Sequence, residues 1–98
     1  MYYKISVLGR VQGVCYRASI DMIARDMDLK GFVENLDDGS VLIIVKLSKD
    51  EKEGFIERLK FEDDSLIKVE NIEIEKISKT EWNSYNIADF TVKYKKSI

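Results

Sequence analysis

Residues 9–17 read Gly9-Arg10-Val11-Gln12-Gly13-Val14-Cys15-Tyr16-Arg17; they follow an alternating apolar segment and lead into an amphipathic one. The two glycines permit positive φ angles and close approach of other atoms to the backbone. The first amide groups of a helix have no internal partners, and they lie at the positive end of the helix dipole. A strand–loop–helix junction of this kind therefore predicts a binding site for an anion such as phosphate.

Arg17 falls in the first turn of the expected helix, where the helix dipole repels a cation. That cost indicates that an anion binds nearby, because a planar guanidinium can donate two parallel hydrogen bonds to a phosphate. The alternative is an ordinary solvated arginine, and the glycine pair alone does not decide between the two.

The residues before this loop are predicted to form a strand, and the residues after it are predicted to form a helix. Apolar and polar side chains alternate over residues 3–7, which predicts a half-buried strand. Apolar residues then recur at helical spacing, which predicts a helix over residues 16–29. Gly31 suits the left-handed cap that would end this helix.

Two further strands are expected over residues 31–36 and 41–47, joined by a hairpin turn at residues 37–40. Residues 41–45 are apolar on both faces, as in a central strand. Ser48 and Glu51 form a capping-box pattern that begins a second helix. Residues 69–77 alternate again, residues 78–89 form a looser segment around Trp82, and residues 90–94 end the pattern as a short strand.

This order predicts an α+β fold, a ferredoxin-like βαββαβ sandwich over residues 1–98 as a single domain. We expect an antiparallel sheet, with two helices on one face and a short C-terminal strand.

Composition excludes several classes of function. The net charge is −2 with no dense Lys/Arg block, which argues against nucleic-acid binding. The chain has no histidine and one cysteine, so we expect no zinc site and no Ser-His or Cys-His nucleophilic pair. No apolar run approaches the ~20 residues that span a bilayer, and the first residues lack a signal-peptide pattern. We therefore expect a cytoplasmic protein.

Three blocks of the sequence resemble the acylphosphatase family, in the family's order and at its separations. Residues 9–17 fit the signature Gly-x-Val-Gln-Gly-Val-x-Phe/Tyr-Arg. Residues 31–35 fit Gly-aromatic-Val-x-Asn, and residues 39–41 fit the Gly-x-Val that begins the next strand. Residues 90–94 also resemble the closing strand of the family.

The resemblance implies a small enzyme that hydrolyses the carboxyl–phosphate bond of acyl phosphates without a metal or organic cofactor. It implies a small acyl-phosphate substrate, no nucleic-acid or membrane partner, and a monomer. The catalytic arginine of the family falls on Arg17, and its water-orienting asparagine falls on Asn35. Its phosphate-binding loop falls on Val11, Gln12, Gly13, Val14, Cys15 and Tyr16.

These residue types suit the reaction, because the carboxylate leaves without needing a proton. The enzyme must hold the phosphoryl group, offset its charge and direct a water at phosphorus. Loop amides and Arg17 supply fixed donors, and the Asn35 amide can both accept from water and donate to phosphate. The proton acceptor for the water stays open, since the phosphate of the substrate itself is one candidate.

Some residues have other interpretations or depart from the family pattern. Cys15 is expected to be a small buried hydrophobic residue, and Asp37 and Asp38 to be a solvated turn. Glu34 replaces a residue that is often basic, but strand alternation points it away from Asn35. Leu36 and Leu47 also differ from common family residues.

A noncatalytic anion- or nucleotide-binding module is the alternative function. A single-stranded RNA binder is disfavoured, because the expected strands lack the aromatic and basic residues it needs.

Overall fold

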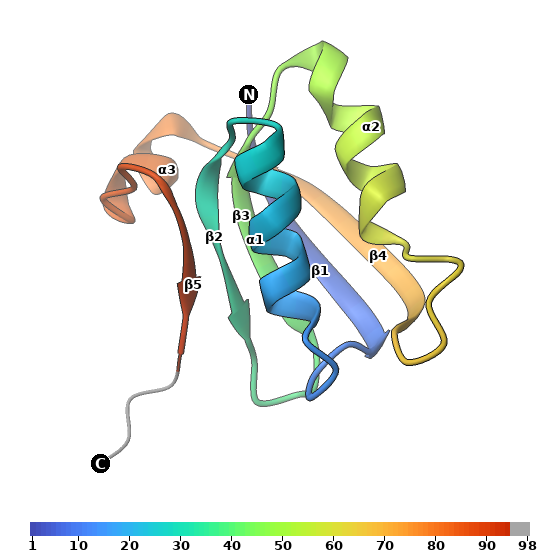
Figure 1. Cartoon of the computed structure of the whole chain (residues 1–98). Helices are drawn as coiled ribbons and strands as arrows, with labels where there is room; N and C mark the ends of the chain where they lie inside the picture. The colour runs from blue at the N-terminus through green and yellow to red at the C-terminus, as the bar shows by residue number, and fades with distance from the viewer. Residues whose placement is uncertain (95–98) are drawn as a thin grey trace.

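Within residues 1–94, the part of the chain that the computed structural model describes, five strands form one sheet in the order β4–β1–β3–β2–β5 (Figure 1). The strands are β1 (Tyr2–Arg10), β2 (Lys30–Asn35), β3 (Val41–Lys46), β4 (Lys68–Ile77) and β5 (Phe90–Lys93). β3 lies in the middle of the sheet, and Ile43 and Ile44, which point to opposite faces, are both fully buried. The prediction of a central strand from its continuous apolar run is confirmed.

Two helices, α1 (Tyr16–Asp26) and α2 (Lys49–Leu59), cover one face of the sheet (Figure 1). Ile20 of α1 and Phe55 of α2 pack with Ile5, Val33 and Ile43 of the sheet in the main core. The Ser48 side chain accepts from the Glu51 amide, and the Glu51 carboxylate accepts from the Ser48 amide, as the capping box predicts. The ferredoxin-like βαββαβ fold is confirmed. None of the helices in this part of the chain is long and apolar enough to cross a membrane.

The sheet is mixed rather than wholly antiparallel. β1 pairs antiparallel with β3 and β4, and β2 pairs antiparallel with β3, but β5 pairs parallel with β2. Strand direction follows from the path of the connecting chain, which here runs from β4 at one edge to β5 at the other. Alternation within residues 90–94 carries no information about that path, so the expected antiparallel arrangement is wrong for β5.

The segment expected to be loose contains a third helix, α3 (Lys79–Ser84). Its N-cap, Ser78, accepts from the Glu81 amide. Trp82 of α3 packs on the second face of the sheet against Phe32 and Ile44, and it stacks on Tyr2 at 4.9 Å between ring centroids. Six residues are too few to give a helical period, but the Ser-x-x-Glu pattern is a signal that could have found this helix.

The prediction that Gly31 caps α1 is wrong. α1 ends at Asp26, and Asp28, with φ of 55°, is the residue in the left-handed region after it. Gly31 lies in β2 with φ of 155°, and a Cβ there would lie 1.9 Å from the Ile44 carbonyl oxygen of β3. The glycine is needed because β2 and β3 approach closely at this position. Its place in the sequence, a few residues after the helix, does not reveal this tertiary requirement.

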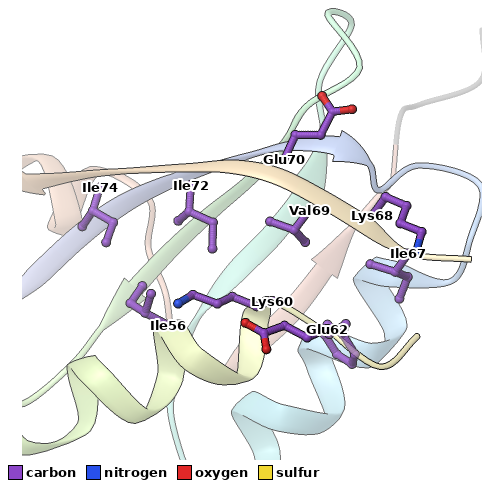
Figure 2. A pocket seen from close by; sticks show the side chains of 10 residues that line it. Ile56, Lys60, Glu62, Ile67, Lys68, Val69, Glu70, Ile72 and Ile74 are labelled. Carbon is purple, nitrogen blue, oxygen red and sulfur yellow. The ribbon is translucent and has the colours of Figure 1, made fainter. Parts of the chain in front are cut away.

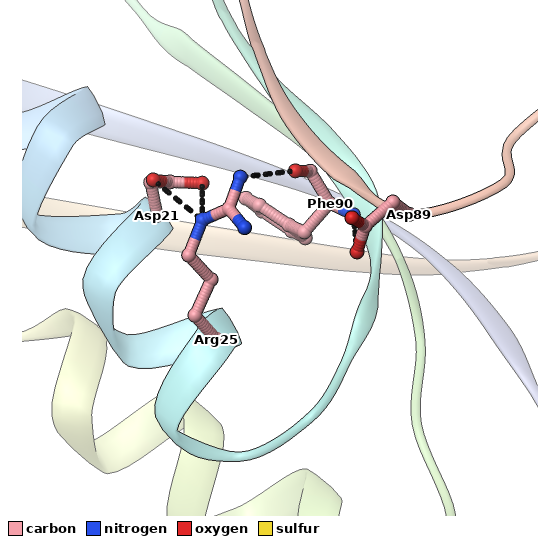
Figure 3. Close-up of polar contacts among 4 residues, drawn as sticks. All are labelled: Asp21, Arg25, Asp89 and Phe90. Atoms are coloured by element: carbon pink, nitrogen blue, oxygen red, sulfur yellow. Dashed lines mark hydrogen bonds and ion pairs between the residues drawn. The ribbon is translucent and has the colours of Figure 1, made fainter.

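The C-terminal strand is attached to α1 as well as to β2. Figure 3 shows Arg25 of α1 donating from Nη2 to the Phe90 carbonyl at 3.1 Å, while its Nε donates to both carboxylate oxygens of Asp21 at 3.0 and 3.1 Å. Because Asp21 fixes the guanidinium, Arg25 helps to hold the start of β5 against α1.

Replacing Gly31 with alanine is expected to destabilise the protein by at least about 2 kcal/mol, because β2 and β3 must separate to admit the methyl group. Gly54, within α2 and with open space at its Cβ, is the matched control. Gly54→Ala is expected to stabilise the protein by about 0.5–1 kcal/mol, since alanine favours a helix. Urea unfolding measures the free energy of unfolding of both variants. Equal changes in the two variants would contradict the requirement for a glycine at residue 31.

Candidate active site

A cleft of about 300 Å³ opens where the loop after β1 meets the start of α1 and the end of β2. Its lining includes Arg17 from α1 and Asn35 from β2, the two residues that the sequence singled out. The complete lining consists of Val11, Gly13, Cys15, Tyr16, Arg17, Ala18, Asn35 and Tyr94. The fold therefore brings a cation, a carboxamide and the loop backbone to one place.

The backbone of the loop has the alternating conformation that concentrates amide groups. Gly13 has φ of 74° and Cys15 has φ of 63°, whereas Val14 between them is outside the positive-φ region. No side chain caps α1, and its first turn has no acidic residue. Successive amides in such an alternation form a concave anion-binding nest, and the helix dipole adds positive potential to it.

Gln12 and Val14 hold this loop in place but do not line the cleft. Gln12 Nε2 donates to the carbonyls of Leu36 and Ser40 at 2.8 and 2.9 Å, which ties the loop to the β2–β3 hairpin. Val14 packs against the main core. Residues 11–16, which were expected to form one phosphate-binding loop, therefore include two residues, Gln12 and Val14, that anchor the loop without lining the cleft.

Val11 and Tyr16 anchor the ends of the loop in the core, since each is only 1% exposed. The Tyr16 hydroxyl donates to the Leu59 carbonyl of α2 at 2.8 Å, and burial raises the pKa of this phenol. The hydroxyl is committed to that structural contact.

The prediction that Cys15 is buried is wrong, because its side chain is exposed. Cys15 occupies the N-cap of α1 in the left-handed region and lines the cleft. The turn that presents the loop amides carries this residue to the surface.

Arg17 is held by the C-terminal strand. Its Nη1 donates to the Lys93 carbonyl at 2.9 Å, and its guanidinium carbon lies 4.6 Å from the centroid of the Tyr94 ring. Because β5 runs parallel to β2 with Lys93 beside Glu34, the chain delivers Tyr94 to the end of β2 that carries Asn35. Sequence reasoning missed Tyr94; its aromatic side chain at the end of a terminal strand was the available signal.

Asn35 carries an acceptor that the protein does not use. Its Oδ1 is buried and has no hydrogen-bond partner among residues 1–94. Leaving a buried acceptor unsatisfied costs about 1–3 kcal/mol, so such an atom marks a place where a water or ligand binds.

The nearby carboxylates lie outside the cleft. The pKa of Tyr85, on the α3 side of the sheet, is raised by burial, by its hydrogen bond to Glu81 and, in smaller part, by Glu34. Glu34 does not line the cleft, and it lies on the same face of β2 as Phe32, which packs in the cluster with Trp82, as strand alternation predicts. Asp38 accepts from the Ser40 hydroxyl and amide, which lowers its pKa and places it in the turn. In the described part of the chain, no cluster of three or more His, Cys, Asp or Glu side chains is arranged to hold a metal ion.

The chain is similar to known proteins in both sequence and fold. The family model described as Acylphosphatase matches residues 3–92. An acylphosphatase of Ligilactobacillus salivarius is 34% identical over 87% of this chain and 94% of its own length. The crystal structure of acylphosphatase from Bacillus subtilis superposes with a TM-score of 0.80 at 32% identity, covering 95% of this chain and 98% of that one. A structure of full-length HypF in the phosphate- and nucleotide-bound form has a TM-score of 0.79 at 28% identity, covering 95% of this chain but 12% of that one.

Replacing Gln12 with alanine is expected to cost about 1–2 kcal/mol of stability, because the Leu36 and Ser40 carbonyls both lose their donor. It is also expected to loosen the loop, so that amide hydrogen exchange at Gly13 and Cys15 accelerates. Gln12→Glu, which keeps the length but removes the donor, should reproduce both effects. Unchanged exchange in both variants would show that the loop is fixed by other contacts.

Proposed function

Because the chain belongs to the acylphosphatase family, we propose that it hydrolyses the carboxyl–phosphate bond of acyl phosphates without a metal ion, using Arg17 and Asn35. The observation that carries this proposal is the cleft in which the loop amides, Arg17 and the unpaired Oδ1 of Asn35 meet. The family supports the reaction class, and the shared cleft supports the roles proposed for Arg17 and Asn35.

The loop and Arg17 bind the phosphoryl group. Amides of the nest around Gly13 and Cys15 donate to its oxygens, and the start of α1 adds a favourable field. The hydrogen bond from Arg17 to the Lys93 carbonyl uses one of the five N–H groups of the guanidinium, so others remain to contact phosphate. These donors are fixed before the substrate arrives, which is the condition under which they stabilise the transition state most.

Asn35 orients the attacking water. Its Oδ1 accepts a hydrogen bond from the water, and its amide nitrogen donates to a phosphoryl oxygen. This places the water for in-line displacement of the carboxylate, a step that relies on positioning and electrostatics. The carboxylate leaves unprotonated, so the site needs no general acid.

Replacing Arg17 or Asn35 with alanine is expected to lower kcat/KM for benzoyl phosphate by about 10²–10³-fold in each case, the usual effect of removing a preorganised donor. Two substitutions of exposed side chains outside the cleft, Arg58→Ala in α2 and Asn71→Ala in β4, are matched controls that are expected to retain activity. A chelator such as EDTA is expected to leave the wild-type rate unchanged.

The same assay tests the alternative, a noncatalytic anion- or nucleotide-binding module. That module would shift the Gly13 amide resonance on addition of inorganic phosphate and yet hydrolyse benzoyl phosphate no faster than buffer. Hydrolysis that survives both substitutions would reject the roles of Arg17 and Asn35 while keeping the reaction class.

Tyr94 is proposed as a positioning residue for Arg17. Tyr94→Ala is expected to weaken inhibition by inorganic phosphate about two- to five-fold, which corresponds to the ~0.5–1 kcal/mol of an exposed cation–π contact. Tyr94→Phe keeps the ring and should behave as wild type. Weaker phosphate inhibition in this variant would indicate that the hydroxyl, rather than the ring, has the role. Tighter phosphate binding by Tyr94→Ala would mean that the ring holds Arg17 back from the ligand.

A further inference from the structure

β4 is an exposed edge of the sheet. It pairs with β1 on one side, and on its other side no strand within residues 1–94 pairs with it (Figure 1). At ten residues it is the longest strand of the described chain, and nearly all of its side chains are exposed or half-buried. A long edge strand is a template for pairing with another chain unless its side chains prevent it.

A groove of about 770 Å³ runs between this edge and α2, and it is lined by isoleucines together with charged residues such as Lys60 and Lys68. Figure 2 shows Ile72 and Ile74 of β4 and Ile56 of α2 pointing toward the space between the two elements. Ile72 and Ile74 pair with the core residues Val7 and Ile5, so they lie on the helix-facing side of the sheet. Ile74 is nevertheless 40% exposed.

The other side of β4 is acidic. Glu73 and Glu75 lie opposite Ser6 and Lys4 of β1, both are exposed, and neither forms an ion pair with another described residue. β4 therefore offers a partner two chemically distinct rows of side chains, an apolar row facing the groove and an acidic row on the opposite face.

A second copy of the same strand brings like charges together when it pairs about Glu73 or about Ile74. Two antiparallel strands related by a two-fold axis place residues of the same face directly opposite each other, and like charges in such positions are destabilising. Pairing centred on Glu73 sets that carboxylate against its own copy, and pairing centred on Ile74 sets Glu73 against Glu75.

We propose that β4 is a docking edge for an extended segment of another protein in which apolar residues alternate with lysine or arginine. The segment adds a strand to the sheet, and main-chain hydrogen bonds to the free side of β4 supply affinity. Its apolar side chains fill the groove beside Ile72 and Ile74, and its basic side chains pair with Glu73 and Glu75. This interaction is independent of the hydrolytic site, which uses none of these residues.

The test is a titration of the ¹⁵N-labelled full chain with the peptide acetyl-Lys-Val-Lys-Ile-Lys-Val-Lys-amide. Saturable shifts are expected at the amides of β4 and at the groove residues. A peptide of the same composition with its lysines grouped at one end should bind about ten-fold more weakly, because it keeps the charge but loses the alternation. The double variant Glu73→Lys/Glu75→Lys should also lose about ten-fold in affinity for the alternating peptide and gain affinity for its glutamate counterpart.

The outcomes separate the possible explanations. Hydrolysis of benzoyl phosphate by the double variant at the wild-type rate verifies that it is folded. Equal binding of the alternating and grouped peptides would mean that charge attraction alone explains the binding, and it would overturn the proposal. The absence of saturable binding would overturn it too. Sedimentation of the wild type as a dimer that Ile72→Lys dissociates would also overturn it, since the occupant would then be a second copy.

Discussion

The site depends on an uncapped helix start. Helices usually satisfy their first amides with a side chain, but α1 has no capping side chain and no acidic residue in its first turn. Gly13 and Cys15 in the loop before it both have left-handed conformations. This arrangement is stable only if the loop is anchored from outside, which the two hydrogen bonds of Gln12 and the burial of Val11 and Tyr16 accomplish.

Placement of the other groups follows from sheet topology. Strand alternation in β2 directs Val33 into the main core and Phe32 to the opposite cluster, and it thereby separates Asn35 from Glu34. Parallel pairing of β5 with β2 then brings the Lys93 carbonyl and the Tyr94 ring to Arg17. The two arginines of α1 both donate to β5 carbonyls, so the same strand that closes the sheet fixes the guanidinium in the cleft.

Local patterns predicted most of the elements that depend on neighbours in sequence, but the Ser-x-x-Glu pattern that begins α3 was missed. The apolar run of β3, the capping box at Ser48 and the alternation of β1 and β4 gave the element order, and the resemblance to acylphosphatases gave Arg17 and Asn35. Features set by distant contacts were missed. Gly31 is dictated by the Ile44 carbonyl, and the direction of β5 follows from the path through α3. The position of Tyr94 beside Arg17 follows from the parallel pairing of β5 with β2, which ends at Lys93. Cys15 was misplaced because burial statistics for cysteine take no account of a left-handed N-cap.

The chemistry of the cleft restricts the substrates that its donors can turn over. The chain has no histidine, and no carboxyl group lines the cleft within the described residues. The Tyr16 hydroxyl, which could donate a proton, is buried against the Leu59 carbonyl with a raised pKa. A phosphate monoester of an alcohol would release an alkoxide and need a proton donor, whereas an acyl phosphate releases a stable carboxylate. The proposed site of amides, one guanidinium and one carboxamide is therefore expected to favour mixed anhydrides over phosphate esters of alcohols.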